Sequence, residues 1–218
     1  MIIWQALRRA MAATTLALLS GCAAISAVSD AATPLDVFEL RAPDSIPAVA
    51  GRARAQDVIV EMPTTSGALS TDRILIRPNP VQAQYLPDVR WSEPTPQMVQ
   101  TLMLRSIEAT GAVRYVGRTP LGASGDFAIV TEVIDFQAEV TPDGETANVQ
   151  ITLLVRVVRE RDASIVATRS LTGSAVAPST ETLTVIDAFN AASDQVFPEF
   201  ANWVPTAPPA RSTQPPAR

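Results

Sequence analysis

The chain of 218 residues contains no histidine and no lysine, and its 17 basic side chains are all arginine. Without histidine, neither a Ser-His-Asp nor a Cys-His catalytic arrangement can form, and the usual imidazole metal ligand is missing. Without lysine, Schiff-base chemistry and an ordinary P-loop nucleotide site are excluded. Only carboxylates, hydroxyls and arginine remain for catalysis. The composition therefore favours a protein that is not an enzyme.

Cysteine occurs only once, as Cys22. Zinc and haem sites therefore lack their usual ligands, and we expect neither a metal nor any other cofactor. Carboxylates are the remaining acid and base candidates, and glycoside hydrolysis would need two of them facing one cleft. Asp135 and Glu139 instead alternate with apolar residues, which indicates the solvated face of a strand. The whole acidic group comprises Glu132, Asp135, Glu139, Asp143 and Glu145.

The net charge argues against a nucleic-acid partner. The formal charge is −5, whereas affinity for a phosphate backbone depends on clustered basic side chains. The closest grouping is Arg156, Arg159 and Arg161, which lies near a turn among acidic residues and is typical of a solvated loop.

The amino terminus has the three parts of a secretory signal peptide. Arg8 and Arg9 precede an apolar run from residue 10 to 19, which is too short to span a membrane as a helix. The following residues, from Leu19 to Cys22, resemble the bacterial lipobox. By that resemblance the chain is cut between Gly21 and Cys22, and Cys22 receives lipid. The alternatives are an ordinary cleaved signal or a buried free cysteine.

The lipobox resemblance also implies a location. Several acyl chains on one residue anchor a protein firmly, because each buried methylene contributes about 0.8 kcal/mol. Ala23 and Ala24 follow the cysteine, so the aspartate that retains lipoproteins in the inner membrane of enteric bacteria is absent. The periplasmic face of the outer membrane is therefore expected.

The remaining chain divides into three parts. Residues 22–33 are small and polar, which predicts a lipidated tether. Residues 34–203 carry the periodic apolar patterns of one domain, and residues 204–218 form a proline-rich tail that we expect to be disordered. A role of this tail as a proline-rich ligand is the less favoured alternative.

The periodicities within residues 34–203 predict an α+β fold. Short strands are expected at 36–41, 57–61 and 113–116, with a hairpin at 73–86. A helix is expected after Thr95-Pro96 and ends at Gly111. Long alternating runs then predict an antiparallel meander, with Val130, Ile134 and Phe136 on one face of its first strand. A second helix, starting near 179–180, is expected to cover that sheet, with its apolar stripe formed by Leu183, Ile186, Phe189, Val196 and Phe200.

Two aromatic residues before the first helix allow two interpretations. Tyr85 and Trp91 are expected to fill the seam between hairpin and helix. The alternative is that they join Leu102 and Ile107 in lining a lipid groove or a partner surface.

These features together resemble a known family. A lipobox, a first strand ending in Phe38-Glu39-Leu40, the hairpin that returns at Tyr85, and Trp91 before a proline-started helix are similar to the ABC-type transport auxiliary lipoprotein family, which includes the paraquat-inducible protein C type. The spacing Tyr85-x5-Trp91 is its chief motif. Phe38 stands where tyrosine is commoner in that family.

The resemblance implies a non-enzymatic component of an Mce-type lipid transport system. Its expected partners are an Mce-domain protein, an ABC permease and an ATPase, and its expected role is docking while lipids move between the inner and outer membranes. It leaves open whether the domain acts alone or as a homo-oligomer. Direct binding of a lipid or another small hydrophobic ligand is the alternative function, and a carboxylate-based hydrolase is the least favoured.

Overall fold

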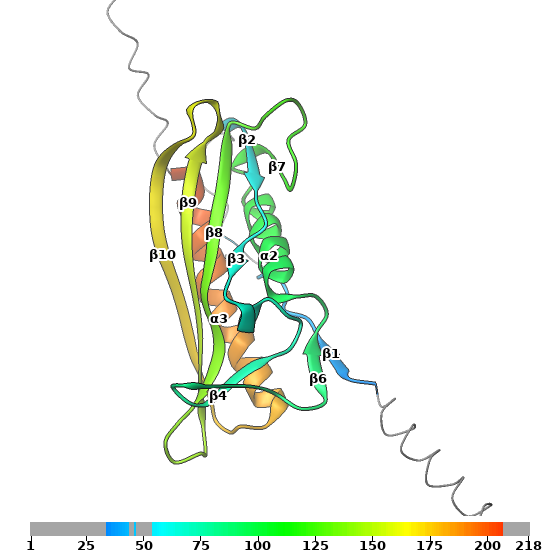
Figure 1. Cartoon of the computed structure of the whole chain (residues 1–218). Helices are drawn as coiled ribbons and strands as arrows, with labels where there is room; N and C mark the ends of the chain where they lie inside the picture. Colours follow the sequence, from blue (N-terminus) through cyan, green and yellow to red (C-terminus); the bar gives the residue numbers. More distant parts are fainter. Residues whose placement is uncertain (1–33, 44–45, 47–53, 207–218) are drawn as a thin grey trace, which may run out of the picture. The chain divides into compact units, whose positions relative to one another are not determined.

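The longest strands of the fold are three consecutive ones, seen in a computed structural model that describes residues 34–43, 46 and 54–206 (Figure 1). They are β8 (Phe127–Val140), β9 (Ala147–Arg159) and β10 (Ser164–Ala177). β8 pairs antiparallel with β9, and β9 pairs antiparallel with β10 along their lengths. The predicted meander is confirmed, because alternating runs joined by short turns pair with their neighbours in sequence.

The other edge of β8 pairs with three shorter strands in turn. β2 (Arg54–Val60), β3 (Thr64–Thr65) and β4 (Leu75–Asn79) run parallel to it, opposite its beginning, middle and end. β7 (Val113–Gly117) adds parallel to β2. The sheet is therefore mixed, with its antiparallel part formed by the meander and by the hairpin of β4 and β5 (Gln82–Tyr85).

Several short strands and turns complete the fold. β1 (Asp36–Phe38) pairs with β6 (Val89–Trp91), and the amide of Ser92 donates to the carbonyl of Phe38 at 2.7 Å. The short 3₁₀ turns are η1 (Gly67–Leu69), η2 (Glu160–Asp162) and η3 (Val204–Thr206).

The two main helices begin and end close to the predicted residues. α2 (Thr95–Thr110) carries Pro96 in its first turn and ends at Gly111, whose φ of 58° is the left-handed conformation that glycine adopts easily. The N-cap position is Pro94, so the helix includes both Thr95 and Pro96. α3 (Thr182–Trp203) follows β10 and starts two residues later than predicted.

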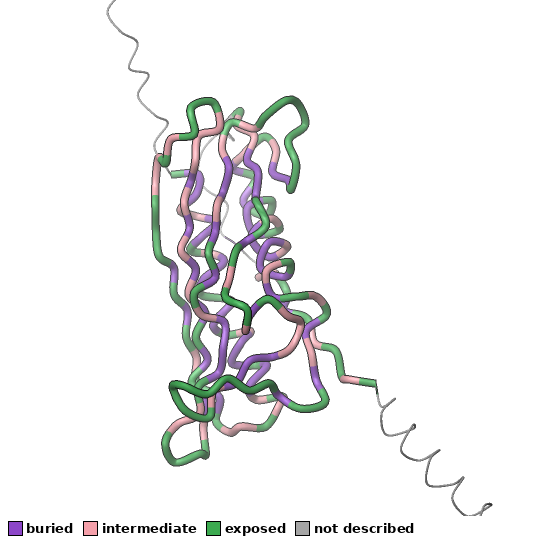
Figure 2. Tube along the Cα trace, viewed as in Figure 1, coloured by how far each residue is buried: buried purple, intermediate pink, exposed green. Residues whose placement is uncertain are grey.

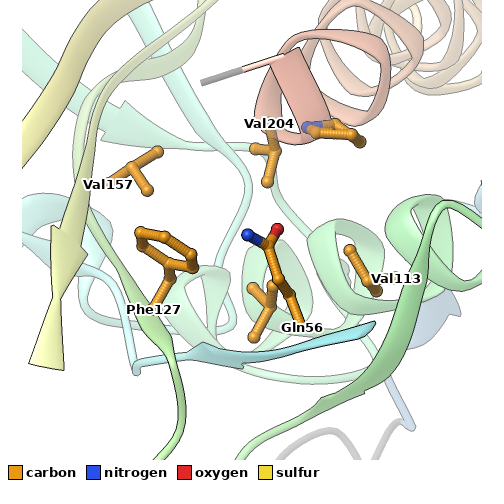
Figure 3. Close-up of a pocket in the computed structure, with 7 residues that line it drawn as sticks. Gln56, Val113, Phe127, Val157 and Val204 are labelled. Atoms are coloured by element: carbon orange, nitrogen blue, oxygen red, sulfur yellow. The ribbon is translucent and has the colours of Figure 1, made fainter. Parts of the chain in front are cut away.

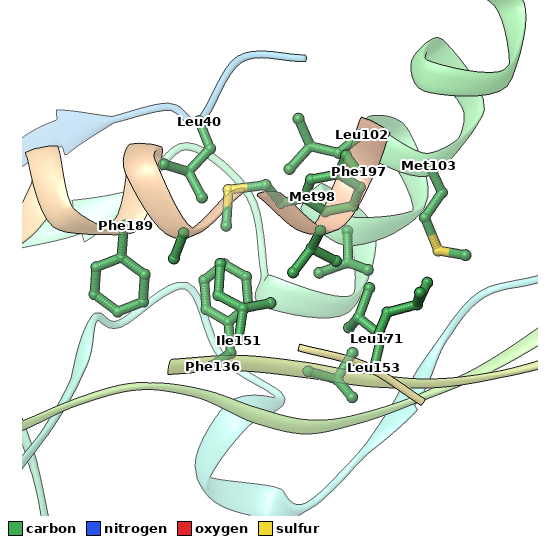
Figure 4. Packing of buried hydrophobic residues seen from close by; sticks show 14 of the residues in the cluster. Leu40, Met98, Leu102, Met103, Phe136, Ile151, Leu153, Leu171, Phe189 and Phe197 are labelled. Atoms are coloured by element: carbon green, nitrogen blue, oxygen red, sulfur yellow. The ribbon is translucent and has the colours of Figure 1, made fainter. Parts of the chain in front are cut away.

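Both helices pack on one face of the sheet, and the hydrophobic core lies between the helices and the sheet (Figure 4). Thr131 of β8 contacts Met103 of α2, while Gly173 of β10 lies against α3. Residues of the sheet that face the helices are buried, and the opposite face and the loops are largely exposed (Figure 2). The fold is α+β, as predicted, with the sheet covered by two helices.

Three aromatic rings form the centre of one part of this core. Trp91 meets Phe136 and Phe189 edge to face, with ring centroids 6.1 and 5.3 Å apart. Phe136 and Phe189 stack on each other at 5.3 Å. These rings join β6, β8 and α3, which are far apart in the sequence.

A β-bulge at Ile134 corrects the predicted pattern of β8. The register with β9 shifts between Val133 and Asp135, so Ile134 has no opposite residue and is 47% exposed. Before the bulge, Ile129 and Val133 are buried and Val130 is not; after it, Phe136 is buried. The expected apolar face was wrong for Val130 and Ile134, because one extra residue inverts the alternation.

Two further expectations differ at the ends of α3. Leu183 is 66% exposed in the first turn of α3, so it lies outside the buried stripe. Val204 and Pro205 are buried in η3, directly after the helix. The packed domain therefore extends beyond residue 203, into the segment predicted as tail; residues 207–218 lie outside the described part.

Candidate functional site

The four residues proposed as a groove or partner surface do not form one exposed surface. Trp91, Leu102 and Ile107 are each at most 1% exposed and belong to the core. They come from β6 and α2, whose apolar sides face the sheet and α3. The favoured expectation for Trp91, packing at the seam between hairpin and helix, matches this placement.

Tyr85 is the only one of the four with substantial exposure, at 38%. Its hydroxyl donates to the carbonyl of Ala68 at 3.1 Å, and the guanidinium of Arg73 lies 5.8 Å from the ring centroid. Arg73 also donates to the carbonyl of Leu86 at 3.2 Å. These contacts hold the hairpin of β4 and β5 against η1.

The predicted lipid attachment and cleavage residues, Cys22 and Gly21, lie outside the described residues. Lipidation therefore stays a prediction from the sequence. None of the helices in the described part of the chain is long and apolar enough to cross a membrane.

A group of charged residues lies at the end of the sheet where β2 and β7 meet. Arg114 donates from Nε and an Nη atom to the two carboxylate oxygens of Asp57, at 2.7 and 2.6 Å. Hydrogen bonding to Arg114, followed by its positive charge, lowers the pKa of Asp57. Asp126 accepts from the amide of Asp57 at 2.8 Å. This arrangement fixes the start of β8 against β2.

A second ion pair lies at the turn between β9 and β10. Asp162 accepts from the hydroxyl of Ser164 at 2.6 Å and from Arg159 at 2.8 Å, and these contacts lower its pKa, the Ser164 bond most. Arg161 is more exposed and lies 3.8 Å from the same carboxylate. The predicted solvated loop is therefore a turn whose charges pair internally, which leaves no basic patch there.

A small apolar pocket lies beside these charges, between the sheet and η3 (Figure 3). Its lining includes Val58, Val157, Val204, Phe127 and Gln56. Only about 10 Å³ is free for the centre of a water-sized molecule, which is room for about one water. Pockets that enclose drug-sized ligands hold about 300–1,000 Å³. The pocket is therefore a packing gap in this conformation.

The carboxylates that the sequence singled out lie mainly on the outer face of β8. Asp135 accepts hydrogen bonds from Gln137 and Gln150, and Glu139 accepts one from Gln137, at 3.1 to 3.2 Å. This is the solvated strand face that the sequence predicted. Among the described residues, no three carboxylates or cysteines are grouped so that they could hold a metal ion.

The edge of β10 and the neighbouring side of α3 carry polar contacts that the sequence did not reveal. Gln195 bonds the backbone of Ser174 twice, accepting from its amide at 3.3 Å and donating to its carbonyl at 2.9 Å. Arg169 forms an ion pair with Glu199. The helical and strand periodicities predict the exposed side of each element, but no local pattern shows that these residues meet.

A sequence profile of the family described as ABC-type transport auxiliary lipoprotein component matches residues 38–201, which is most of the chain. The chain belongs to this family. The match covers the sheet and both main helices, so the region that the family shares is the folded domain. The predicted resemblance is confirmed.

Comparisons with individual proteins find similarity in sequence and in fold. An uncharacterized protein of Bradyrhizobium diazoefficiens is 28% identical over 169 residues, which is 76% of this chain and 44% of that protein. The chain thus spans less than half the length of the curated relative it matches. A crystal structure of a Xanthomonas campestris protein shares the fold, with a TM-score of 0.71, 23% identity, and coverage of 78% of this chain and 95% of that one. A second crystal structure, also of an uncharacterized protein, has a TM-score of 0.56 at 13% identity over 78% of this chain and 96% of that one.

Proposed function

We propose that this auxiliary lipoprotein is held by lipid on Cys22 at the periplasmic face of the outer membrane. There its α+β domain docks an Mce-domain protein of an ABC-type system that moves lipids between the two membranes. The family match over residues 38–201 carries this proposal, because it links the folded domain to an ABC transporter. The Mce-domain partner, the lipid cargo and the outer-membrane location follow from the resemblance and the lipobox.

The chemistry of the chain supports a docking role. Movement of lipid against a gradient needs ATP hydrolysis, and this chain has neither the lysine of a P-loop nor a histidine. A separate ATPase would supply that energy. A lipid anchor and a folded domain with exposed polar faces suit a protein that positions other components.

Direct binding of a lipid by the domain is the second candidate, and the geometry favours it less. Leu102 and Ile107, which would line the groove, are buried in the core. The apolar pocket beside η3 holds about one water, whereas an acyl chain needs a far larger cavity.

Crosslinking in intact cells, followed by purification of the full-length lipoprotein from membranes, tests the docking role. We expect an Mce-domain protein, a permease and an ATPase among the identified products, and their genes beside this one. Recovery of none of the three would contradict the proposal. Native mass spectrometry of detergent-free domain tests the alternative, and a stoichiometric co-purifying lipid would favour it over docking.

A further inference from the structure

Two charged side chains of the long meander have no partner among the described residues. The meander carries six charged side chains, three in β8, two in β9 and one in β10. Glu132 and Arg156, which have opposite charges, form neither a hydrogen bond nor an ion pair through their side chains with any described residue. Hydrogen bonds or ion pairs hold the other four, which are Asp135, Glu139, Arg159 and Arg169.

Both unpaired side chains lie on the outer face of the sheet, away from the helices. Thr131 contacts Met103 of α2, so Glu132, the next residue of β8, points the other way. In β9, Val155 is buried in the core without exposed surface, so Arg156 also points to the outer face. This face therefore presents one negative and one positive charge that no described residue neutralises.

The register of β8 and β9 fixes how these two charges lie among their neighbours. Val130 lies opposite Arg156, and Glu132 lies opposite Leu154. Adjacent strands are about 4.8 Å apart, and residues two positions apart on one strand are about 7 Å apart. The four side chains therefore mark the corners of a rectangle, with the charges on one diagonal and the apolar pair of Val130 and Leu154 on the other.

This rectangle is complementary to a second copy of itself. In a face-to-face contact whose two-fold axis lies along the apolar diagonal, Val130 and Leu154 each meet their own counterparts. The same rotation places Arg156 of each copy over Glu132 of the other, which gives two ion pairs. A two-fold symmetric interface needs both signs of charge at symmetry-related positions, and the rectangle supplies them.

Further apolar side chains adjoin the rectangle. The bulge in β8 turns Ile134 to the outer face, where it is 47% exposed, and bulges commonly redirect side chains at functional surfaces. Val158, two residues after Arg156, adds a half-buried apolar side chain to the same face. We call the outer patch the set of Val130, Glu132, Ile134, Leu154, Arg156 and Val158.

We propose that the outer patch binds a second copy of this chain, face to face and with two-fold symmetry. Val130 and Leu154 form the apolar centre of the contact, and the two ion pairs between Glu132 and Arg156 fix its orientation. Each unpaired charge thereby gains a partner. The inference goes beyond the proposed function, which concerns a different protein, and does not depend on it.

Thiol crosslinking of the full-length protein in intact cells tests this assignment. Leu154→Cys places a thiol close to the two-fold axis, where it meets its counterpart in the other copy. Asn148→Cys is the matched control on the same strand and face, six residues away. Asn148 is the more exposed of the two, so accessibility alone would favour the control.

The measurement uses two differently tagged copies in one cell and a short bismaleimide crosslinker. The wild-type chain, whose one cysteine is Cys22, gives the background. We expect about tenfold more capture between the tags from Leu154→Cys than from Asn148→Cys. Crosslinking in cells suits this contact, because the outer patch is small beside the about 20–30 residues that each side of a stable interface contributes.

Charge reversals in the Leu154→Cys background test the two ion pairs. When both copies carry Arg156→Glu, or both carry Glu132→Arg, like charges meet, so we expect capture to fall about tenfold. One copy with Arg156→Glu and one with Glu132→Arg should restore capture, because one patch then has two negative charges and the other two positive ones. Arg105→Glu, at an exposed position of α2, changes the net charge equally and should leave capture unchanged.

Several results would overturn the assignment. Equal capture from the two thiols, or capture of a different protein in place of a second copy, would show that the outer patch does not face itself. Capture that ignores the single reversals, or that the mixed pair does not restore, would show that Glu132 and Arg156 do not meet across the contact.

Two further measurements keep the outcomes distinct. Thermal melts identify any reversal that unfolds the domain, and in that case the contrast between the thiols at Leu154 and Asn148 decides. Co-purification of transporter components is measured separately in the same cells. Loss of pairing between copies with the components still bound would refute this inference alone, and the reverse result would refute the proposed function alone.

Discussion

Individual aromatic residues contribute unequally to this fold, although two of them belong to one family motif. Trp91 is 1% exposed and joins β6 to rings from β8 and α3. Tyr85 is 38% exposed and holds a hairpin by its hydroxyl. The spacing of the motif therefore reflects a buried anchor and a surface contact, which have different energetic roles.

Replacement of Trp91 should destabilise the domain far more than replacement of Tyr85. Trp91→Ala leaves a cavity beside the stacked rings of Phe136 and Phe189, so we expect a loss of about 3–5 kcal/mol in the free energy of unfolding. Tyr85→Ala removes a partly solvated ring and one hydrogen bond, and should cost about 1–2 kcal/mol. Chemical denaturation of the purified soluble domain measures both. Equal losses would contradict the assigned roles.

The ion pair of Asp57 and Arg114 should make stability depend on acid pH. Hydrogen bonding to Arg114 lowers the pKa of Asp57 in the folded state, below the ordinary value of about 3.9 expected when unfolded. The contribution is therefore present above about pH 4 and is lost as the pH falls through the folded-state pKa.

Thermal melts of wild type and Asp57→Asn between pH 7 and pH 2 test this dependence. We expect the difference in Tm to shrink as the pH falls below about 4, because protonation breaks the pair in the wild type. Arg114→Gln should give the same pH profile, and the double variant should add little. A difference that stays constant down to pH 2 would refute the assignment.

Among the elements, α3 and β10 are joined by an unusually close approach. A methyl group built on Gly173 would lie 2.3 Å from the carbonyl oxygen of Ala192 and 2.8 Å from Cγ2 of Val196. The backbone of α3 is therefore very close to the backbone of β10 at Gly173. Gln195 and Glu199 reach the strand from the same helix, through Ser174 and Arg169.

Gly173→Ala should disturb this contact. The added Cβ meets backbone, which cannot rotate away, so we expect a loss of about 1–3 kcal/mol in the free energy of unfolding. Gly122→Ala is the matched control, because a Cβ there has no atom within 4 Å and the residue has no positive φ. Equal stability of the two variants would show that α3 does not pack as closely as described.

For the whole molecule, the proposed function depends on attachment to a membrane. The described residues contain no helix that could cross a membrane, and the lipobox cysteine lies in the part of the chain outside them. In the proposed function, acyl chains on Cys22 supply the attachment, and the domain acts at the distance that residues 22–33 allow. Twelve extended residues span at most about 40 Å.

Cys22→Ser should release the protein from the membrane. Without the thiol no diacylglycerol can be attached, and the remaining surface of the described domain is largely polar on the outer sheet face. Fractionation of cells into soluble and membrane parts measures the effect, with Ser20→Ala as the control that keeps the cysteine. Continued retention of Cys22→Ser in the membrane fraction would mean that something other than this lipid holds the protein.

The sequence alone was sufficient for features that depend on local pattern. It predicted α2 with its end at Gly111, the hairpin that returns at Tyr85 and the three-stranded meander, because each repeats a helical or strand period or uses a turn residue within a few positions. It also predicted the family, through short motifs. The bulge at Ile134 was not predicted, since a bulge depends on the opposite strand as well.

The tertiary structure was needed for every feature that depends on distant partners. Parallel pairing of β2, β3 and β4 with one strand, the burial of Trp91 against Phe136 and Phe189, and the contact of Gln195 with the edge of β10 each join residues far apart in the chain. No local period encodes which elements meet, because pairing is selected by the packing of the whole core.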